Sequence, residues 1–240
     1  MLARKDALEP FSCLNRTLFQ ETLKTILPTS FLPDLDNIMR NQNRYAIIKY
    51  VADRLASFFL IAALIPLFVA VIVLLLVNQG LPLFFTQERL GLHNKPFSIL
   101  KFRTMSPTLP GSIDFDKVNS RITPIGHFLR ATSLDELPQL FNILLGHMSF
   151  VGPRPLMPEA TASLTPSCRL QRHSVRPGLT GLAQTMAYSD LSRRFEIDIK
   201  YVANLSLIAD TKILINTILL IITGKKTSIN SAAYQSRNDS

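Results

Sequence analysis

Residues 55–77 read LASFFLIAALIPLFVAVIVLLLV, an uncharged stretch that decides how the rest of the chain is organised. As an α-helix it would be about 35 Å long at about 1.5 Å per residue, enough to cross a hydrocarbon core of roughly 30 Å. Pro66 lies near its middle, where a proline removes a backbone hydrogen bond and clashes with the preceding turn. The stretch therefore predicts an apolar helix that is kinked at Pro66.

Both flanks of this stretch are basic, whereas a helix that crosses a membrane normally has more basic residues on one side. A kinked hairpin that enters and leaves the same leaflet explains the two flanks and the proline together, because each arm of about 17 Å is one leaflet deep. An ordinary spanning helix that tolerates a proline is the alternative. The flanking residues are Arg40, Arg44, Lys49 and Arg54 before the stretch, and Arg89, Lys95, Lys101 and Arg103 after it.

Composition narrows the class of protein. The 240 residues suit one domain with appended segments, and the net charge of +9 indicates a polyanionic partner such as nucleic acid, anionic lipid or a phosphate-bearing substrate. An apolar content of 47% is high for a soluble nucleic-acid binder, and no nucleic-acid-binding motif is present. The two cysteines, Cys13 and Cys168, form no CxxC motif, so we expect neither a disulfide framework nor a zinc–thiolate site.

The remaining elements are expected to be short. Residues 1–40 resemble no signal peptide and predict amphipathic pieces interrupted at Pro10, Pro28 and Pro33, and residues 227–240 form a polar tail. Strands are predicted at 83–85 and 97–100 around a turn at 91–94, loops at 106–120 and 177–184, and irregular chain at 152–155. Helices are predicted near 125–129, 137–145, 193–202 and 210–222, the last one amphipathic and too short to span a membrane.

The decapeptide RATSLDELPQ at 130–139 places two adjacent carboxylates, Asp135 and Glu136, where a helix is predicted to begin. Ser133 and Glu136 match a capping box, while capping by Asp135 would put Pro138 at a position whose N–H has no intrahelical partner. Either register explains the two acids as helix caps without any chemistry. A helix N-terminus also suits phosphate, and a carboxylate there can bind Mg²⁺ or attack phosphorus.

Nearby cations favour the phosphate-binding interpretation. Any one of them alone could be a solvated surface charge, but arginine forks match phosphate oxygens and the set lies beside turn-forming residues. The prolines on both sides of Arg154 restrict the chain that carries it. The set comprises Lys101, Arg103, Arg121, Arg130 and Arg154. The turn PGLTG at 177–181 is a weak candidate for an anion-binding nest of backbone amides, and it is no Walker A loop.

Residues 45–222 resemble the bacterial sugar transferase family, the monotopic phosphoglycosyl transferases that start lipid-linked glycan assembly. The matching motifs occur in order over about three-quarters of the chain. They are Asp53-Arg54 before the stretch broken at Pro66, then PLFFTQERLG (82–91), KFRTM (101–105), RITPIG (121–126), SLDELPQ (133–139), MSFVGPRP (148–155), RPGLTGLAQ (176–184) and DIKYV (198–202).

The resemblance implies a mechanism. Asp135 corresponds to the nucleophile that takes a phosphosugar from a UDP-sugar, releasing UMP, before undecaprenyl phosphate or another polyprenyl phosphate accepts it. Glu136 corresponds to the second acid of the catalytic pair, and Mg²⁺ is expected beside Asp135. The resemblance also implies a re-entrant membrane helix broken at Pro66. The implied substrate-binding residues are Lys101, Arg103, Arg121, Arg130, Arg154 and Gln184.

The expected fold is a helix-rich α/β domain on the cytoplasmic face of a bacterial inner membrane, with a re-entrant helix and amphipathic interfacial helices. The expected divisions are an N-terminal extension (1–44), the membrane helix (45–80), the catalytic domain (81–226) and the tail (227–240). Expected partners are UDP-sugar, polyprenyl phosphate and membrane lipids, without nucleic acid, and a homodimer is left open. A catalytically silent membrane adaptor of the same fold and a basic nucleic-acid binder are the rival functions.

Three features depart from the family pattern. The family usually has Asp-Pro-Arg where this chain has Asn119-Ser120-Arg121, which counts against an acidic role at position 119. The chain has no tryptophan, and residues 1–40 match no part of the family pattern. None of these departures touches the Asp135–Glu136 pair.

Overall fold

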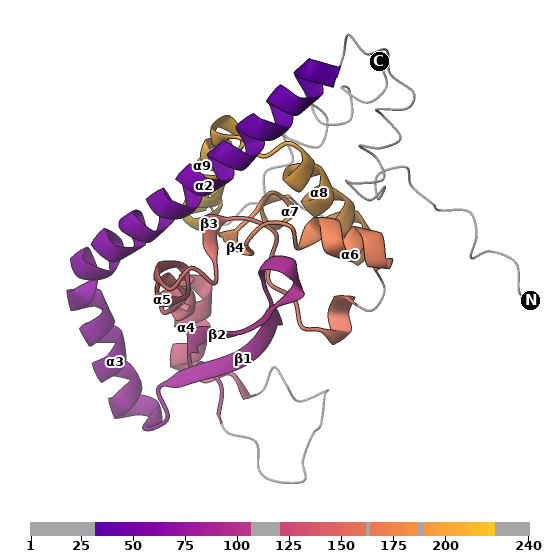
Figure 1. Ribbon diagram of the computed structural model, residues 1–240. Helices are drawn as coiled ribbons and strands as arrows, with labels where there is room; N and C mark the ends of the chain where they lie inside the picture. Colours follow the sequence, from indigo (N-terminus) through magenta and orange to yellow (C-terminus); the bar gives the residue numbers. More distant parts are fainter. Residues whose placement is uncertain (1–31, 107–120, 162–163, 187–189, 224–240) are drawn as a thin grey trace, which may run out of the picture.

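The computed structural model describes residues 32–106, 121–161, 164–186 and 190–223. This part of the chain is helix-rich with two small two-stranded sheets, as expected for a helix-rich α/β protein (Figure 1). The helices are α2 (Leu32–Ala63), α3 (Ile65–Gln79), α4 (Pro124–Ala131), α5 (Gln139–Leu144), α6 (Pro166–Arg172), α7 (Leu182–Thr185), α8 (Leu191–Ala203) and α9 (Leu207–Thr223). The strands are β1 (Phe84–Leu90), β2 (Pro96–Phe102), β3 (Ser149–Val151) and β4 (Gly178–Thr180).

The apolar stretch forms the bent pair α2–α3, which is broken at Leu64 and turns through 62°. Pro66 is the second residue of α3, where its missing N–H costs no intrahelical hydrogen bond, so the predicted kink is confirmed. Within the described residues, no single helix has the length and apolar character to cross a membrane, whereas this bent pair has both. Pro33, which we expected to interrupt a helix, is instead the second residue of α2.

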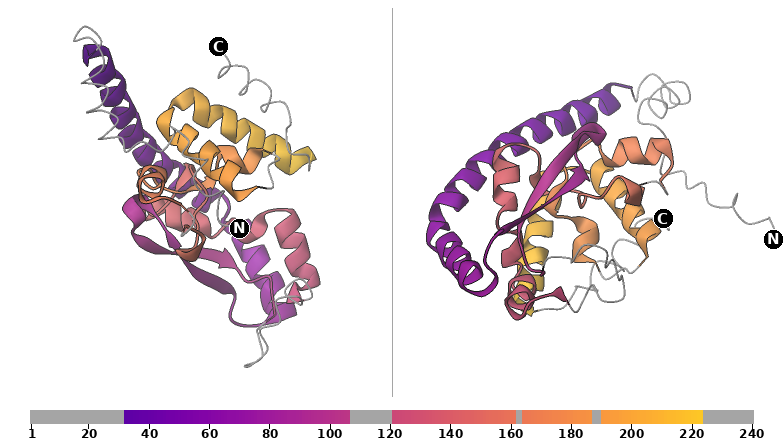
Figure 2. Two further views of the ribbon diagram at one scale, coloured as in Figure 1. Left: turned by 90° about the vertical axis from the view of Figure 1, so that its right-hand side faces the viewer. Right: turned by 90° about the horizontal axis from the view of Figure 1, so that it is seen from below.

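The bent pair packs against the rest of the molecule along one side. Figures 1 and 2 show α4, α5 and the β1–β2 hairpin on the inner side of the bend. Phe68, Val71 and Leu75 of α3 join the hydrophobic core there, and the Ser57 hydroxyl donates a 2.6 Å hydrogen bond to the Leu140 carbonyl oxygen. The outward-facing apolar side chains, among them Phe59, stay exposed. An exposed apolar surface of this extent is typical of a face that meets lipid or protein.

The two sheets differ in how well the sequence predicted them. Strands β1 and β2 pair antiparallel, with Glu88 opposite Ser98, so the predicted hairpin is confirmed with longer strands. The parallel pair β3–β4 was missed, and the prediction of a loop over 177–184 is wrong, because β4 and α7 occupy it. Gly178 is needed for close approach, since a Cβ atom there would lie 2.1 Å from the Gly152 nitrogen. Neither Gly178 nor Gly181 has a positive φ, so the predicted nest is not formed.

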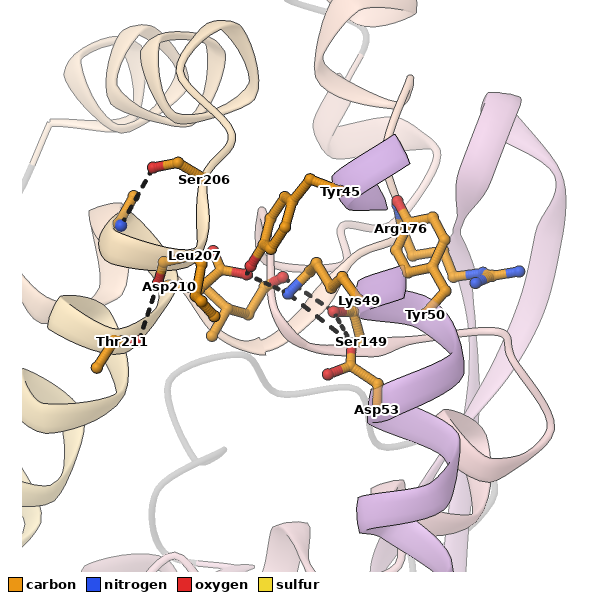
Figure 3. A network of polar contacts seen from close by, with 12 residues as sticks. Tyr45, Lys49, Tyr50, Asp53, Ser149, Arg176, Ser206, Leu207, Asp210 and Thr211 are labelled. Carbon is orange, nitrogen blue, oxygen red and sulfur yellow. Dashed lines mark hydrogen bonds and ion pairs between the residues drawn. The ribbon is translucent and has the colours of Figure 1, made fainter. Parts of the chain in front are cut away.

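A buried polar network joins α2 to the C-terminal helices (Figure 3). The Lys49 ammonium nitrogen lies 2.5 Å from Oδ2 of Asp210 on α9 and 3.8 Å from Oδ2 of Asp53. Tyr201 of α8 donates to the other Asp210 oxygen at 2.7 Å, and Ser149 of β3 donates to Asp53 at 2.5 Å. Each buried charge is therefore paired, which fixes α2, α9 and β3 relative to one another.

The other predicted helices are confirmed as α4, α5, α8 and α9, each within a few residues of its expected position. The expectation of no disulfide is wrong for Cys168, which is disulfide-bonded in this structure. The predictions for residues 1–31, for most of the 106–120 loop, for Asn119 and for the 227–240 tail lie outside the described residues.

Candidate active site

Asp135 and Glu136 lie in a 3₁₀ turn, Leu134–Glu136, between α4 and α5. The turn follows Ser133, which has a left-handed backbone conformation with a φ of 57°. Both predicted capping registers are wrong: neither Ser133 nor Asp135 caps a helix with its side chain, and α5 begins only at Gln139 after Pro138. The two acids are therefore not needed as caps, which removes the purely structural explanation for them.

Asp135 is buried, with 8% of its surface exposed. Burial raises the pKa of its carboxyl group and neighbouring Glu136 adds to the rise, while the positive charges of Lys101 and Arg130 oppose it. Within the described residues, no lysine or arginine nitrogen forms an ion pair with Asp135. Its carboxylate is therefore held in a partly desolvated position with no direct ionic partner, which suits a nucleophile or a metal ligand.

Glu136 has the ionic partners that Asp135 lacks. The Lys101 ammonium nitrogen lies 2.5 Å from Oε1 of Glu136, and a guanidinium nitrogen of Arg154 lies 3.8 Å from the same atom. Lys101 comes from β2 and Arg154 from the Pro153–Pro155 segment, so this contact joins three distant parts of the sequence. The structure thus divides the pair of acids into one ion-paired carboxylate and one available carboxylate.

A cavity of about 1200 Å³ surrounds this pair and contains every site residue that the sequence predicted. Six basic and two acidic side chains line it, so its wall carries a net positive charge that suits an anionic diphosphate. The predicted lining residues are Lys101, Arg103, Arg121, Arg130, Asp135, Glu136, Arg154 and Gln184.

Arg89 of β1 is a cavity cation that the site prediction missed. It follows Phe85 and Gln87 along the strand, and all three side chains line the cavity because alternate residues of a strand point to the same face. Burial and the nearby charge of Arg154 lower the pKa of Arg89. The period of two in β1 was the signal that could have identified it.

Three of the predicted substrate-binding side chains are hydrogen-bonded to neighbouring groups of the protein. Arg130 donates to the Thr104 hydroxyl at 2.8 Å, and Arg121 donates to the Ser106 carbonyl oxygen at 2.9 Å. The Gln184 amide donates to the Leu179 carbonyl oxygen at 3.3 Å. These contacts orient the side chains along the cavity wall, and their roles in binding substrate stay predictions.

Arg103 is held at the end of the apolar helix pair. Its terminal nitrogens donate to the carbonyl oxygens of Gln79 at 2.6 Å, Gly80 at 2.9 Å and Leu81 at 3.2 Å. These oxygens lie at the C-terminal end of α3, where carbonyl groups lack intrahelical donors. Arg103 therefore joins α3 to the strand that carries Lys101.

Replacing Arg103 with methionine should leave those carbonyl oxygens without a donor and lower stability by about 1–3 kcal/mol. The KM for UDP-sugar should stay within about threefold of the wild type, because both donor groups are already engaged. Thermal unfolding and steady-state kinetics would measure the two effects, and Arg121→Met, which removes one exposed hydrogen bond, is the control for stability alone. Unchanged stability with a strongly raised KM would instead assign Arg103 to substrate binding.

A second, buried ion pair holds the segment that carries Arg154. Arg172 of α6 donates to Oδ2 of Asp198 on α8 through Nε at 2.9 Å and a terminal nitrogen at 2.7 Å. The same terminal nitrogen donates to the Arg154 carbonyl oxygen at 2.6 Å. The Arg154 side chain itself is 53% exposed. Its main chain is fixed, while its guanidinium group, at 3.8 Å from Glu136, is exposed enough to meet a ligand.

The site prediction missed Arg172 and Asp198. Asp198 lies on the apolar face of α8 together with Phe195 and Val202, and all three are buried. An acidic residue on the inward face of an amphipathic helix requires a buried cationic partner, and this position was the available signal. No comparable pattern in the sequence indicates that this partner is Arg172.

The pH dependence of activity should reflect Asp135. A nucleophilic carboxylate must be ionised, and burial raises its pKa. The acidic limb of the kcat/KM profile should therefore lie at higher pH than for an exposed aspartate. Lys101→Met should move this limb to still higher pH, because the Lys101 charge favours the ionised form. An acidic limb that Lys101→Met leaves in place would contradict the assignment.

With this geometry in place, comparison with known proteins gives the family. The model of the bacterial sugar transferase family matches residues 44–224. The chain belongs to this family. It is therefore a transferase, and Asp135, Glu136 and the cations that line the cavity with them all lie inside the matched residues.

Individual relatives of this bacterial sugar transferase agree. A Bacillus subtilis protein named as an uncharacterized sugar transferase, EpsL, is 39% identical over 174 residues, which cover 72% of this chain and 86% of the relative. The Caulobacter vibrioides UDP-glucose:undecaprenyl-phosphate glucose-1-phosphate transferase is 39% identical over 73% of this chain and 70% of its own. A Klebsiella pneumoniae protein of the same name is 33% identical over 90% of this chain, which spans only 47% of that longer relative.

Proposed function

We propose that this bacterial sugar transferase transfers a sugar-1-phosphate from a UDP-sugar to undecaprenyl or another polyprenyl phosphate. The proposed route is a covalent aspartyl phosphosugar on Asp135, with release of UMP. The observation that carries the proposal is the available Asp135 carboxylate in a positively charged cavity, beside a Glu136 that is already paired with Lys101. The names of the relatives support the same reaction class.

In the first step, a carboxylate oxygen of Asp135 attacks the sugar-bearing phosphorus of the UDP-sugar. A bond forms between this oxygen and phosphorus, and the bond from phosphorus to the bridging oxygen breaks. UMP leaves with that bonding electron pair. Arg154 and Lys101 would stabilise the charge on the phosphate oxygens, since arginine binds such oxygens with two parallel hydrogen bonds and lysine acts as a point charge.

In the second step, a phosphate oxygen of the polyprenyl phosphate attacks the phosphorus of the aspartyl phosphosugar. The bond from phosphorus to Asp135 breaks, and the aspartate regains its carboxylate. The product is a polyprenyl diphosphate sugar, the starting unit of a lipid-linked glycan. Glu136, held between Lys101 and Arg154, would keep those cations oriented in both steps and could exchange a proton with the acceptor phosphate.

The residues present fit a Mg²⁺ ion bound together with substrate. Magnesium is commonly held by one or two carboxylates plus substrate phosphates, and Asp135 offers a carboxylate without an ion pair. The described residues contain no group of three or more His, Cys, Asp or Glu side chains arranged to hold a metal alone. Bound Mg²⁺ would offset the negative charge that develops on the diphosphate.

We further propose that the protein sits on the cytoplasmic face of a bacterial inner membrane, with the bent pair α2–α3 as a re-entrant anchor. Many side chains of its uncharged part, residues 55–77, are apolar and exposed, and basic residues flank this part in the sequence. Helix α9 also exposes a row of apolar side chains, as interfacial helices do. A bound acceptor would then present its phosphate at the depth of the lipid headgroups.

A UMP-release assay tests the proposal. The purified protein in nanodiscs would receive Mg²⁺ and a panel of UDP-glucose, UDP-galactose and N-acetylated UDP-sugars, with and without undecaprenyl phosphate. One sugar should give sustained UMP release only when the acceptor is present. Without acceptor, at most one equivalent of UMP should appear, and mass spectrometry should find a phosphosugar on the peptide containing Asp135. Release that strictly requires acceptor, with no adduct, would refute the covalent route.

A further inference from the structure

One wall of the active-site cavity is apolar and is formed by helix α9. Leu214, Thr217, Ile218 and Ile221 all line the cavity. They follow one another at spacings of three, one and three residues, so they lie on one face of the helix. Figure 1 shows α9 next to β3, β4 and α7, which adjoin the site.

This wall is held in place by polar contacts on both sides of it. The Thr217 hydroxyl lies 2.7 Å from the Thr180 hydroxyl of β4, and it also donates to the Ile213 carbonyl oxygen at 2.8 Å. Asp210, at the start of the helix, belongs to the buried network with Lys49. The helix is thus fixed against both β4 and α2, and its cavity-facing side chains have defined positions.

The side chains on this wall are apolar but not buried. Leu214 is 39% exposed, Ile218 57% and Ile221 52%, although each contributes to the cavity surface. A UDP-sugar is polar along its whole length and gains little from an aliphatic wall. A ligand that combines a phosphate with a hydrocarbon chain matches both the cations and this wall.

We propose that the cavity-facing side of α9, formed by Leu214, Ile218 and Ile221, binds the isoprenoid chain of the acceptor next to its phosphate. The inference rests on the proposed function, because it takes the acceptor to be a polyprenyl phosphate. Phe85 of β1 also lines the cavity and adds an aromatic surface to the same chain. The acceptor would then be selected by its hydrocarbon as well as by its phosphate.

The same helix provides matched controls. Ile215 and Ile222 are also exposed aliphatic residues of α9, but they do not line the cavity. An isoleucine-to-serine change has the same chemistry at each position, so helix propensity and loss of apolar surface are matched. The outward positions report on membrane contact alone, and Ile218 reports on membrane contact plus any contact with the acceptor chain.

The experiment compares Ile218→Ser and Ile221→Ser with Ile215→Ser and Ile222→Ser in nanodiscs of one lipid composition. The KM for undecaprenyl phosphate should rise about tenfold or more in the first two. Each of these variants loses one aliphatic contact that binding of the isoprenoid chain would bury. It should stay within about twofold in the controls. The KM for UDP-sugar should be unchanged in all four, which shows that the polar part of the site is intact.

Two results would overturn the inference. One is an equal rise in acceptor KM for the cavity-facing and outward-facing variants, which would leave α9 as a membrane contact only. The other is no rise in any variant. Vesicle flotation with liposomes of the same composition measures the membrane binding of each variant. The kinetic constants are then compared between variants that bind the membrane equally. Failure of the proposed function is distinguishable, since the wild type itself would then release no UMP with any UDP-sugar and acceptor.

Discussion

Replacing Asp135 with asparagine should reduce sugar-phosphate transfer by about 10⁴-fold or more, because the amide is no nucleophile toward phosphorus. Release of the first equivalent of UMP should disappear as well, since the covalent step itself is lost. The side chain keeps its shape, so the cavity and its cations should stay in place. UMP release and mass spectrometry of the Asp135 peptide would measure both effects.

The same substitution should leave the fold intact or slightly more stable. The pKa of Asp135 is raised in the folded protein, so the unfolded chain gives up this proton at lower pH than the folded one does. The ionised carboxylate therefore destabilises the fold: this penalty is absent below the unfolded pKa and fully present above the folded pKa. Asparagine removes the penalty at neutral pH. A large loss of thermal stability would assign Asp135 to structure instead.

Asp190→Asn is the matched control. Asp190 is exposed at the start of α8, where its side chain accepts a hydrogen bond from the Ser192 amide, and asparagine caps helices equally well. The control should therefore keep both activity and stability. In cells, Asp135→Asn also separates an enzyme from a catalytically silent adaptor. An adaptor would retain its cellular role with this variant, and an enzyme would lose it.

The bent apolar helix pair was predictable because its signals are local. An uncharged stretch with Pro66 inside it specifies a bent apolar helix from length and proline chemistry alone. The turn at 91–94 between two apolar segments likewise predicts the β1–β2 hairpin. By contrast, β3 and β4 are three residues each and pair across an interval that includes α6. Segments this short carry no periodic signal, and their pairing depends on the close approach of Gly178 to Gly152.

The sequence predicted most of the charged residues that line the cavity, except Arg89, but not how they are arranged. The cations and acids that were predicted from charge and motifs all line one cavity. The sequence could not tell that Lys101 would pair with Glu136 and not with Asp135, because the two adjacent acids differ only in the direction in which the backbone points their side chains. The turn that carries both acids follows Ser133, whose positive φ few non-glycine residues adopt.

Removing the buried carboxylate of Asp198 should destabilise the protein more than any surface change. Asp198→Ala leaves the Arg172 guanidinium, which is 2% exposed, without its anionic partner. Breaking a buried pair in this way costs about 3–5 kcal/mol, which for a domain of this size lowers Tm by roughly 6–20 °C. Glu196→Ala on the same helix is the control. Its pair with Arg193 is a surface contact at 3.6 Å and should contribute at most about 1 kcal/mol.

The catalytic consequence of this pair can be separated from its contribution to stability. In the double variant Arg172→Met with Asp198→Leu, two apolar side chains replace the charges and should restore much of the lost stability. The hydrogen bond from Arg172 to the Arg154 carbonyl oxygen stays absent, however, so the segment that carries Arg154 remains less fixed. The double variant should therefore unfold near the wild-type Tm yet show a KM for UDP-sugar raised about tenfold. Recovery of both quantities together would show that the buried pair supports the fold without positioning Arg154.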